Sequence, residues 1–131
     1  MRLFHIGTDG GPESTVTGFW LVEWKKVFSV ALLRFGDGSR EKLHDHAFNC
    51  ISWVLRGRLR EEHIDGKIVH YKPSLKPVIT KRSTFHRVFS IGTTWVFTLR
   101  GPWAKQWHEY DPVSGTYTNL EHGRVVVGSY R

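Results

Sequence analysis

The sequence has few features of a secreted or membrane protein. Cys50 is its only cysteine, so no internal disulfide can form, and a reducing, intracellular compartment is favoured. No run of about 18 consecutive apolar residues is present, which excludes a membrane-spanning helix. Residues 1–20 lack the charged, apolar and small-residue segments of a signal peptide. We therefore expect a soluble, cytoplasmic protein with no membrane partner.

Helical periodicity and internal repeats are also missing. Short segments rich in aromatic and β-branched residues are instead separated by turn signals at spacings of roughly 8 to 12 residues, which is typical of an all-β sandwich or barrel. The 131 residues, 40% of them hydrophobic, suffice for one core and not for two. We predict a single domain over 1–131, with a loose N-terminal arm at 1–18 and a barrel at 19–127.

Positive charge is in excess but is scattered along the chain. The formal net charge is +7, from 19 Lys and Arg against 12 Asp and Glu. Local concentrations occur at two places, Arg56, Arg58 and Arg60, and Lys81, Arg82 and Arg87. They could attract a small anion. No recognition motif accompanies them, so nucleic acid is not an expected partner.

Two histidines one residue apart are the strongest chemical signal. In a strand, His44 and His46 point to one face and Asp45 to the other, so two imidazoles converge. His86, at the start of a later apolar alternation, is the best candidate for a third donor. Three convergent imidazoles with an open position would form a metal site. The alternative is that the pair lies at ordinary polar surface positions.

A hairpin follows the His-x-His segment. Residues 56–58 predict a tight reversal, and Asp65-Gly66 predicts a two-residue hairpin loop. That loop would place Glu61 opposite His70. Glu61 could then act as a general base near a metal, although a structural cross-strand pair with His70 is the favoured interpretation.

These residues resemble the cupin superfamily. Its first motif has two histidines separated by one residue, then a Glu and a Gly, and its second motif supplies another His. Here His44, His46 and Gly57 fit the first, Cys50 stands at the Glu position, and His86 fits the second. The resemblance covers residues 43–99 and is narrowest to small single-domain cupins of bacteria and phages, for which no reaction is established. It implies a double-stranded β-helix, or jelly-roll barrel.

The resemblance also implies a metal centre. Its ligands would be His44, His46 and His86, holding a divalent ion such as Fe, Zn, Mn or Ni. If the Cys50 thiolate were a fourth ligand, the metal would be expected to be Zn or Cu. The preferred alternative is that Cys50 is an inert, buried thiol. The Pro-x-Gly and Asn of the second motif are missing. Cupins with three histidines and a Cys here also resemble thiol dioxygenases, but the His and Tyr of those enzymes have no counterparts on the expected strand.

The resulting hypothesis is a metal-dependent enzyme, an oxygenase or an isomerase, acting on a small and potentially anionic substrate. Its catalytic residues would be Glu61 as base and Arg87 binding a substrate carboxylate, with Arg60 an alternative and surface exposure the simpler account of both arginines. The competing hypothesis is a non-catalytic, ligand-sensing or structural cupin with a degenerate metal site. An exposed strand at 19–24 would favour a homodimer.

Overall fold

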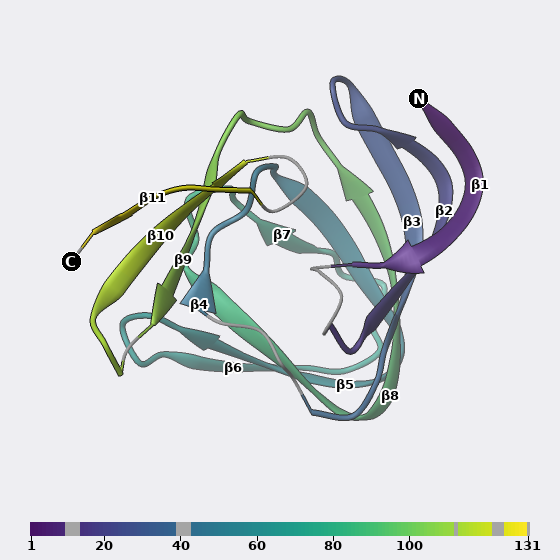
Figure 1. Cartoon of the computed structure of the whole chain (residues 1–131). Helices are drawn as coiled ribbons and strands as arrows, with labels where there is room; N and C mark the ends of the chain where they lie inside the picture. The colour runs from purple at the N-terminus through teal and green to yellow at the C-terminus, as the bar shows by residue number, and fades with distance from the viewer. Residues whose placement is uncertain (10–13, 39–42, 112, 122–124, 131) are drawn as a thin grey trace.

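The described part of the chain folds into a sheet of eleven strands that wraps around an interior, as the computed structural model shows (Figure 1). The structure describes residues 1–9, 14–38, 43–111, 113–121 and 125–130, and within these ranges it contains no helix. No helix there could span a membrane. The all-β prediction is confirmed. The strands are β1 (Arg2–Thr8), β2 (Val16–Trp24), β3 (Phe28–Phe35), β4 (Leu43–His44), β5 (Cys50–His63), β6 (Ile68–Tyr71), β7 (Val78–Thr80), β8 (His86–Arg100), β9 (Trp107–Asp111), β10 (Thr116–Glu121) and β11 (Val125–Tyr130).

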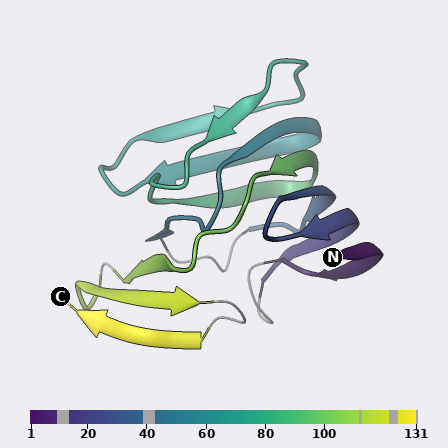
Figure 2. The same cartoon turned by 90° about the horizontal axis from the view of Figure 1, so that it is seen from above.

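Two long strands organise the sheet. β5 and β8 pair antiparallel from His63 opposite His86 to Cys50 opposite Arg100. The sheet continues from β8 through β3 and β2 to β1, and through β4 and β9 to β10 and β11, while β6 and β7 pair with β5. The β10–β11 hairpin therefore lies at the opposite end of the molecule from β5, β6 and β7 (Figure 2). This curvature brings the end of β4 beside the start of β8, where His44 lies opposite His86.

Residues 2–8 and 16–18 are part of the sheet, which corrects the expected loose arm at 1–18, while residues 10–13 of that arm lie outside the described ranges. Strand β1 pairs antiparallel with β2, from Arg2 opposite Glu23 to Thr8 opposite Thr17. Strand β2 is thus covered by β1 on one edge and by β3 on the other, so residues 19–24 are no free edge for a homodimer. The backbone hydrogen bonds with β2 hold residues 2–8 in the sheet, and local composition does not reveal this pairing.

The predicted reversal at residues 56–58 is instead an irregularity inside one continuous strand. The register between β5 and β8 shifts on both sides of Arg56, and Gly57 has a φ of 96°. A Cβ at Gly57 would lie 2.5 Å from Thr94 Oγ1 and 2.6 Å from the Thr93 carbonyl oxygen. Gly57 is therefore required for two reasons: its positive φ, and the close approach of β8 at this position.

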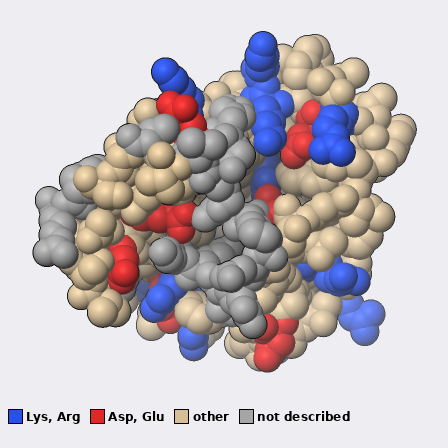
Figure 3. Space-filling model, in the orientation of Figure 1, with Lys and Arg blue, Asp and Glu red and all other residues tan. Residues whose placement is uncertain are grey.

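The largest apolar cluster lies between β2, β3, β5 and β8. Its buried members are Val16, Trp20, Ala31, Leu33, Val54, Leu59 and Val96. They are the inward residues of strands that alternate in burial, as a sheet with one covered face requires. Most charged side chains lie outside, with Glu61 and Arg100 as buried exceptions, and on the face in Figure 3 the Lys and Arg residues form several separate groups, some beside acidic residues.

Candidate metal centre

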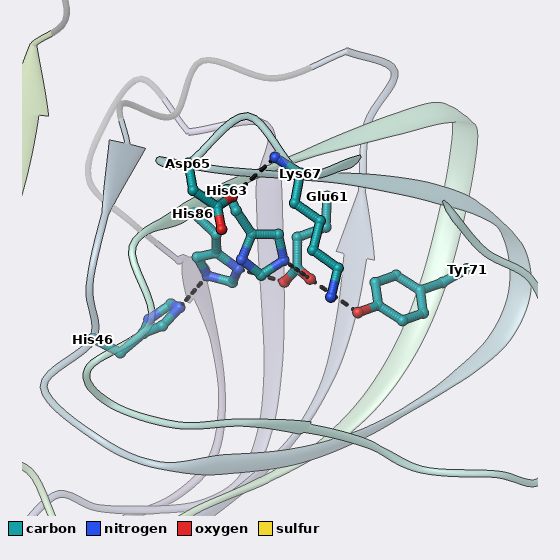
Figure 4. A network of polar contacts seen from close by, with 7 residues as sticks. All are labelled: His46, Glu61, His63, Asp65, Lys67, Tyr71 and His86. Atoms are coloured by element: carbon teal, nitrogen blue, oxygen red, sulfur yellow. Dashed lines mark hydrogen bonds and ion pairs between the residues drawn. The ribbon is translucent and has the colours of Figure 1, made fainter. Parts of the chain in front are cut away.

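Three histidines converge at one end of this interior. His44 on β4 pairs through the backbone with His86 on β8, and His46 follows β4 on the same side. One ring nitrogen from each of His44, His46 and His86 lies within 4.8 Å of the others. His46 Nε2 and His86 Nε2 are 2.6 Å apart, and these two nitrogens point toward one another in Figure 4. The side chains of His44 and His46 thus lie on one side, and His86 joins them, as the sequence predicts.

The electrostatics of the cluster favour a neutral ring at His46. Burial, and then the proximity of His44, His86 and Arg100, lower the pKa of His46 well below its ordinary value. A neutral imidazole has a lone pair available, and this is the form that binds a metal ion. The His46 ring is therefore in the protonation state that a ligand needs at neutral pH.

Glu61 on β5 fixes the orientation of the His86 ring. His86 Nδ1 donates to Glu61 Oε2 at 2.5 Å, which leaves His86 Nε2 as the nitrogen that faces the cluster (Figure 4). Glu61 Oε1 accepts from the Tyr71 hydroxyl and from His63 Nε2, both at 2.9 Å. A carboxylate behind a histidine is a common way to set the tautomer of a metal ligand and raise its basicity.

These bonds hold Glu61 ionised. Burial by itself would raise its pKa, but the hydrogen bond and charge of His86, then Tyr71 and His63, lower it to about 2. Burial, and then the charge and the hydrogen bond of Glu61, raise the pKa of Tyr71. Both oxygens of Glu61 are engaged, and so low a pKa makes a weak proton acceptor. The geometry favours a positioning role over the predicted role of general base.

The predicted pairing of Glu61 with His70 is wrong by one residue. Glu61 lies opposite Val69, and His70 lies opposite Arg60. The reason is the hairpin loop, which has three residues between His63 and Lys67 in place of the predicted two, with His63 N bonded to the Lys67 carbonyl at 2.9 Å. Because side chains alternate along a strand, a shift of one residue changes the partner.

A mostly apolar cavity of about 110 Å³ adjoins the cluster. Besides the three histidines, its polar lining includes Glu61, Cys50 and a pair of residues that sequence analysis missed, Asp9 and Arg100. Cys50 lines the cavity, but its sulfur is not part of the group of converging ligand atoms, which among the described residues contains only the three histidines. Arg100 ends the inward alternation Thr94, Val96, Thr98, which was a signal available in the sequence. Its partner Asp9, far away along the chain, could not be anticipated.

Other predicted residues lie away from the cluster. Arg87 Nε donates to Glu62 Oε1 at 3.0 Å, and Arg87 is not part of the cavity lining. It neighbours the buried His86 in the strand, so its side chain leaves by the other face of the sheet. The later strand β9 does carry a His and a Tyr, but they also lie outside the cavity lining: His108 Nδ1 bonds to Asp45 Oδ2 at 2.9 Å, and Tyr110 packs against Tyr117.

The donor set fits a metal ion. Three imidazole nitrogens, one of them backed by a carboxylate, match the ligands and the outer shell of protein metal sites. His44, His46 and His86 would be the ligands and would leave coordination positions free toward the cavity. Such a site can polarise or activate a small molecule.

Known structures share this architecture. A sugar phosphate isomerase of the cupin superfamily from Silicibacter pomeroyi has a TM-score of 0.65 and 12% sequence identity, over 100% of this chain and 92% of that one. A cupin-2 domain protein from Rhodospirillum rubrum has a TM-score of 0.63 and 12% identity, over 83% and 76%. KdgF from a Halomonas species has a TM-score of 0.57 and 18% identity, over 72% and 85%.

The chain therefore has the cupin fold, a jelly-roll barrel with a histidine cluster in its interior. No family sequence model matches it, and no curated protein is similar to it in sequence. Identities of 12 to 18% with these structures establish the fold alone.

Proposed function

We propose that this cupin binds one divalent metal ion through His44, His46 and His86 and is an enzyme acting on a small molecule. The convergence of three ring nitrogens within 4.8 Å, at the wall of a cavity, carries the proposal. Imidazole donors suit Zn, Fe and Ni, with Mn a weaker match. A bound ion would supply a Lewis acid or an oxygen-binding centre with open positions. The protein would orient the ligand and exclude bulk water from it.

Oxygenation is the first candidate for the reaction and isomerisation the second. Isomerisation by proton transfer needs an acceptor poised near the working pH. The two carboxylates that line the cavity are both engaged, Glu61 by His86, His63 and Tyr71, and Asp9 by Arg100. A reaction centred on the metal, such as oxygenation, does not need a free carboxylate as proton acceptor, whereas isomerisation by proton transfer does.

The cavity also bears on the size of the substrate. A cavity of about 150 Å³ accommodates benzene, so the 110 Å³ here corresponds to a smaller molecule. The cupin from Silicibacter pomeroyi is named a sugar phosphate isomerase. A sugar phosphate is larger than this cavity and would have to extend beyond it. We therefore propose a substrate smaller than a sugar phosphate.

A non-catalytic, ligand-sensing cupin is the second candidate. The engaged carboxylates favour it as well, because a binding module needs no free acid or base. In that case His44, His46 and His86 would hold the metal, or the ligand itself, without turnover.

Metal analysis of untagged protein tests the proposal. We expect about one metal ion per chain in the purified protein or after reconstitution, and its loss in His86→Ala. His70→Ala is the matched control, because His70 is exposed on β6 and lies outside the cluster, so this variant should retain the metal.

Circular dichroism would show that both variants are folded. Wild-type protein that takes up no Zn²⁺, Fe²⁺, Mn²⁺ or Ni²⁺, or a folded His86→Ala that keeps full occupancy, would contradict the proposal. Metal-loaded protein that consumes no O₂ with any small substrate tested would favour the sensing candidate over the oxygenase.

A further inference from the structure

Arg100, the last residue of β8, is a buried cation beside the histidine cluster. Its side chain is 7% exposed, and it lines the cavity together with Cys50, which lies opposite it across the β5–β8 pair. Directly opposed residues of an antiparallel pair project to the same face, so the guanidinium and the thiol belong to one wall. Arginine is almost never buried unless it is paired. The partners of Arg100 therefore indicate what the site is built to hold.

Asp9 satisfies only part of the guanidinium. Arg100 Nη1 donates to Asp9 Oδ1 at 3.1 Å, and Nη2 donates to Oδ2 at 2.7 Å. An arginine side chain has five N–H donors arranged in a planar fork. The buried Nε–H has no hydrogen-bond partner among the described residues. One donor of a buried, charged group is thus left without an acceptor by this part of the chain.

Two aromatic rings hold the guanidinium in place. Its Cζ lies 4.5 Å from the centre of the Phe48 ring and 5.0 Å from that of Trp20. Stacking on aromatic faces stabilises a desolvated guanidinium and restricts its motion. The donor is therefore preorganised, which lowers the entropic cost of binding a ligand.

A second, more open hollow adjoins the same wall. Cys50 and Arg100 line both this hollow and the cavity, and the exposed residues Lys81 and Arg82 also line the hollow. Positive side chains around a depression raise the local concentration of anions. The charge at this wall therefore favours the approach of an anion toward Arg100.

We propose that Arg100 is the anion-binding residue of the cavity and that the ligand is a small carboxylate. Its oxygens accept from the Nε side of the guanidinium, while Asp9 keeps the two bonds it makes with Nη1 and Nη2. Apolar residues such as Val54, Leu59 and Val96 surround the remainder of the ligand. A cavity of about 150 Å³ takes benzene, so the ligand has no more than about six non-hydrogen atoms. This inference rests on the proposed function in one respect, namely that a metal ion held by the three histidines binds the other end of the ligand.

Titration of the ¹⁵N-labelled full chain with butyrate and with butyramide tests this assignment. The two probes have nearly the same shape, and only butyrate is charged. We expect butyrate to shift the Nε–H resonance of Arg100 and to bind at least about tenfold more tightly than butyramide, because charge-assisted hydrogen bonds are the stronger ones. Arg100→Gln should weaken butyrate binding about 10- to 100-fold. Arg58→Gln, at an exposed position of β5 outside the cavity, should leave it unchanged.

A second variant keeps the test decisive if Arg100→Gln does not fold. Asp9→Asn retains the guanidinium and removes the neighbouring negative charge, so butyrate should bind more tightly than in the wild type. Equal affinity for butyrate and butyramide, or an Arg100 resonance that does not respond to butyrate, would overturn the inference.

Zn²⁺ stoichiometry measured on the same samples separates this inference from the proposed function. Full metal occupancy without preference for butyrate would overturn the role of Arg100 and leave the metal site standing. Preference for butyrate without metal uptake would support Arg100 and overturn the metal-dependent function.

Discussion

Glu61→Gln tests the network behind the metal site most directly. Glutamine has nearly the same shape as glutamate, but it has one acceptor oxygen and an NH₂ group in place of two acceptor oxygens. Three donors, from His86, Tyr71 and His63, point at the Glu61 carboxylate. At least one of them loses its acceptor in the variant, and the negative charge behind His86 is lost with it.

The expected effect on metal binding is large. Loss of an outer-shell partner of a metal-binding histidine typically lowers metal affinity 10- to 100-fold, which is about 1.4 to 2.8 kcal/mol. Glu61 is only 5% exposed, so water is a poor substitute for the lost bonds. An unsatisfied buried polar group also lowers the free energy of unfolding by about 1 to 3 kcal/mol.

Competition between the protein and a chelating dye for Zn²⁺ would measure the affinity, and urea unfolding would measure the stability. Glu62→Gln is the matched control. Glu62 is the next residue on β5, and its carboxylate pairs with Arg87 and Arg60 on the other face of the sheet. We expect the control to keep its Zn²⁺ affinity within about twofold and its stability within about 0.5 kcal/mol.

The reasoning would be refuted by a folded Glu61→Gln that binds Zn²⁺ as tightly as the wild type. Equal losses in Glu61→Gln and Glu62→Gln would also refute it, because they would trace the effect to net charge and not to the orientation of His86.

Three further predictions concern the fold and the cavity. Gly57→Ala should destabilise the protein by more than about 1–3 kcal/mol in urea unfolding, because a Cβ there meets the neighbouring strand. Gly66→Ala should destabilise it less, because Gly66 has a similar φ but open space around the added Cβ. Equal losses of stability in the two variants would contradict the close approach at Gly57. Burial would raise the pKa of Asp9, but Arg100 holds it below its ordinary value. The stabilisation from this ion pair is therefore complete above the ordinary pKa of Asp, and it is lost as the pH falls through the lowered pKa. Asp9→Asn should remove that acid-dependent part of the stability, and an unchanged pH profile would disprove it. Cys50→Ser should leave metal stoichiometry unchanged, and a loss of metal would make the thiol a ligand.

The sequence determined the strand-forming segments and the chemical core of the site. β-Branched and aromatic residues with regular turn signals predicted an all-β domain, and these are local properties. The alternation of side chains in a strand also placed His44 and His46 on one face. His86 was identified from its residue type and its resemblance to a second motif, and the β4–β8 pairing then brought it to the other two.

Tertiary structure decided what surrounds that core. The loop of the β5–β6 hairpin has one more residue than its turn signal suggests, and this separates Glu61 from His70. Strand β1 forms because β2 offers it an edge, and that pairing brings Asp9 to Arg100. Each of these features depends on contacts between residues far apart in the chain. Local composition restricts the conformation of single segments, but register and burial follow only from the way the whole sheet closes.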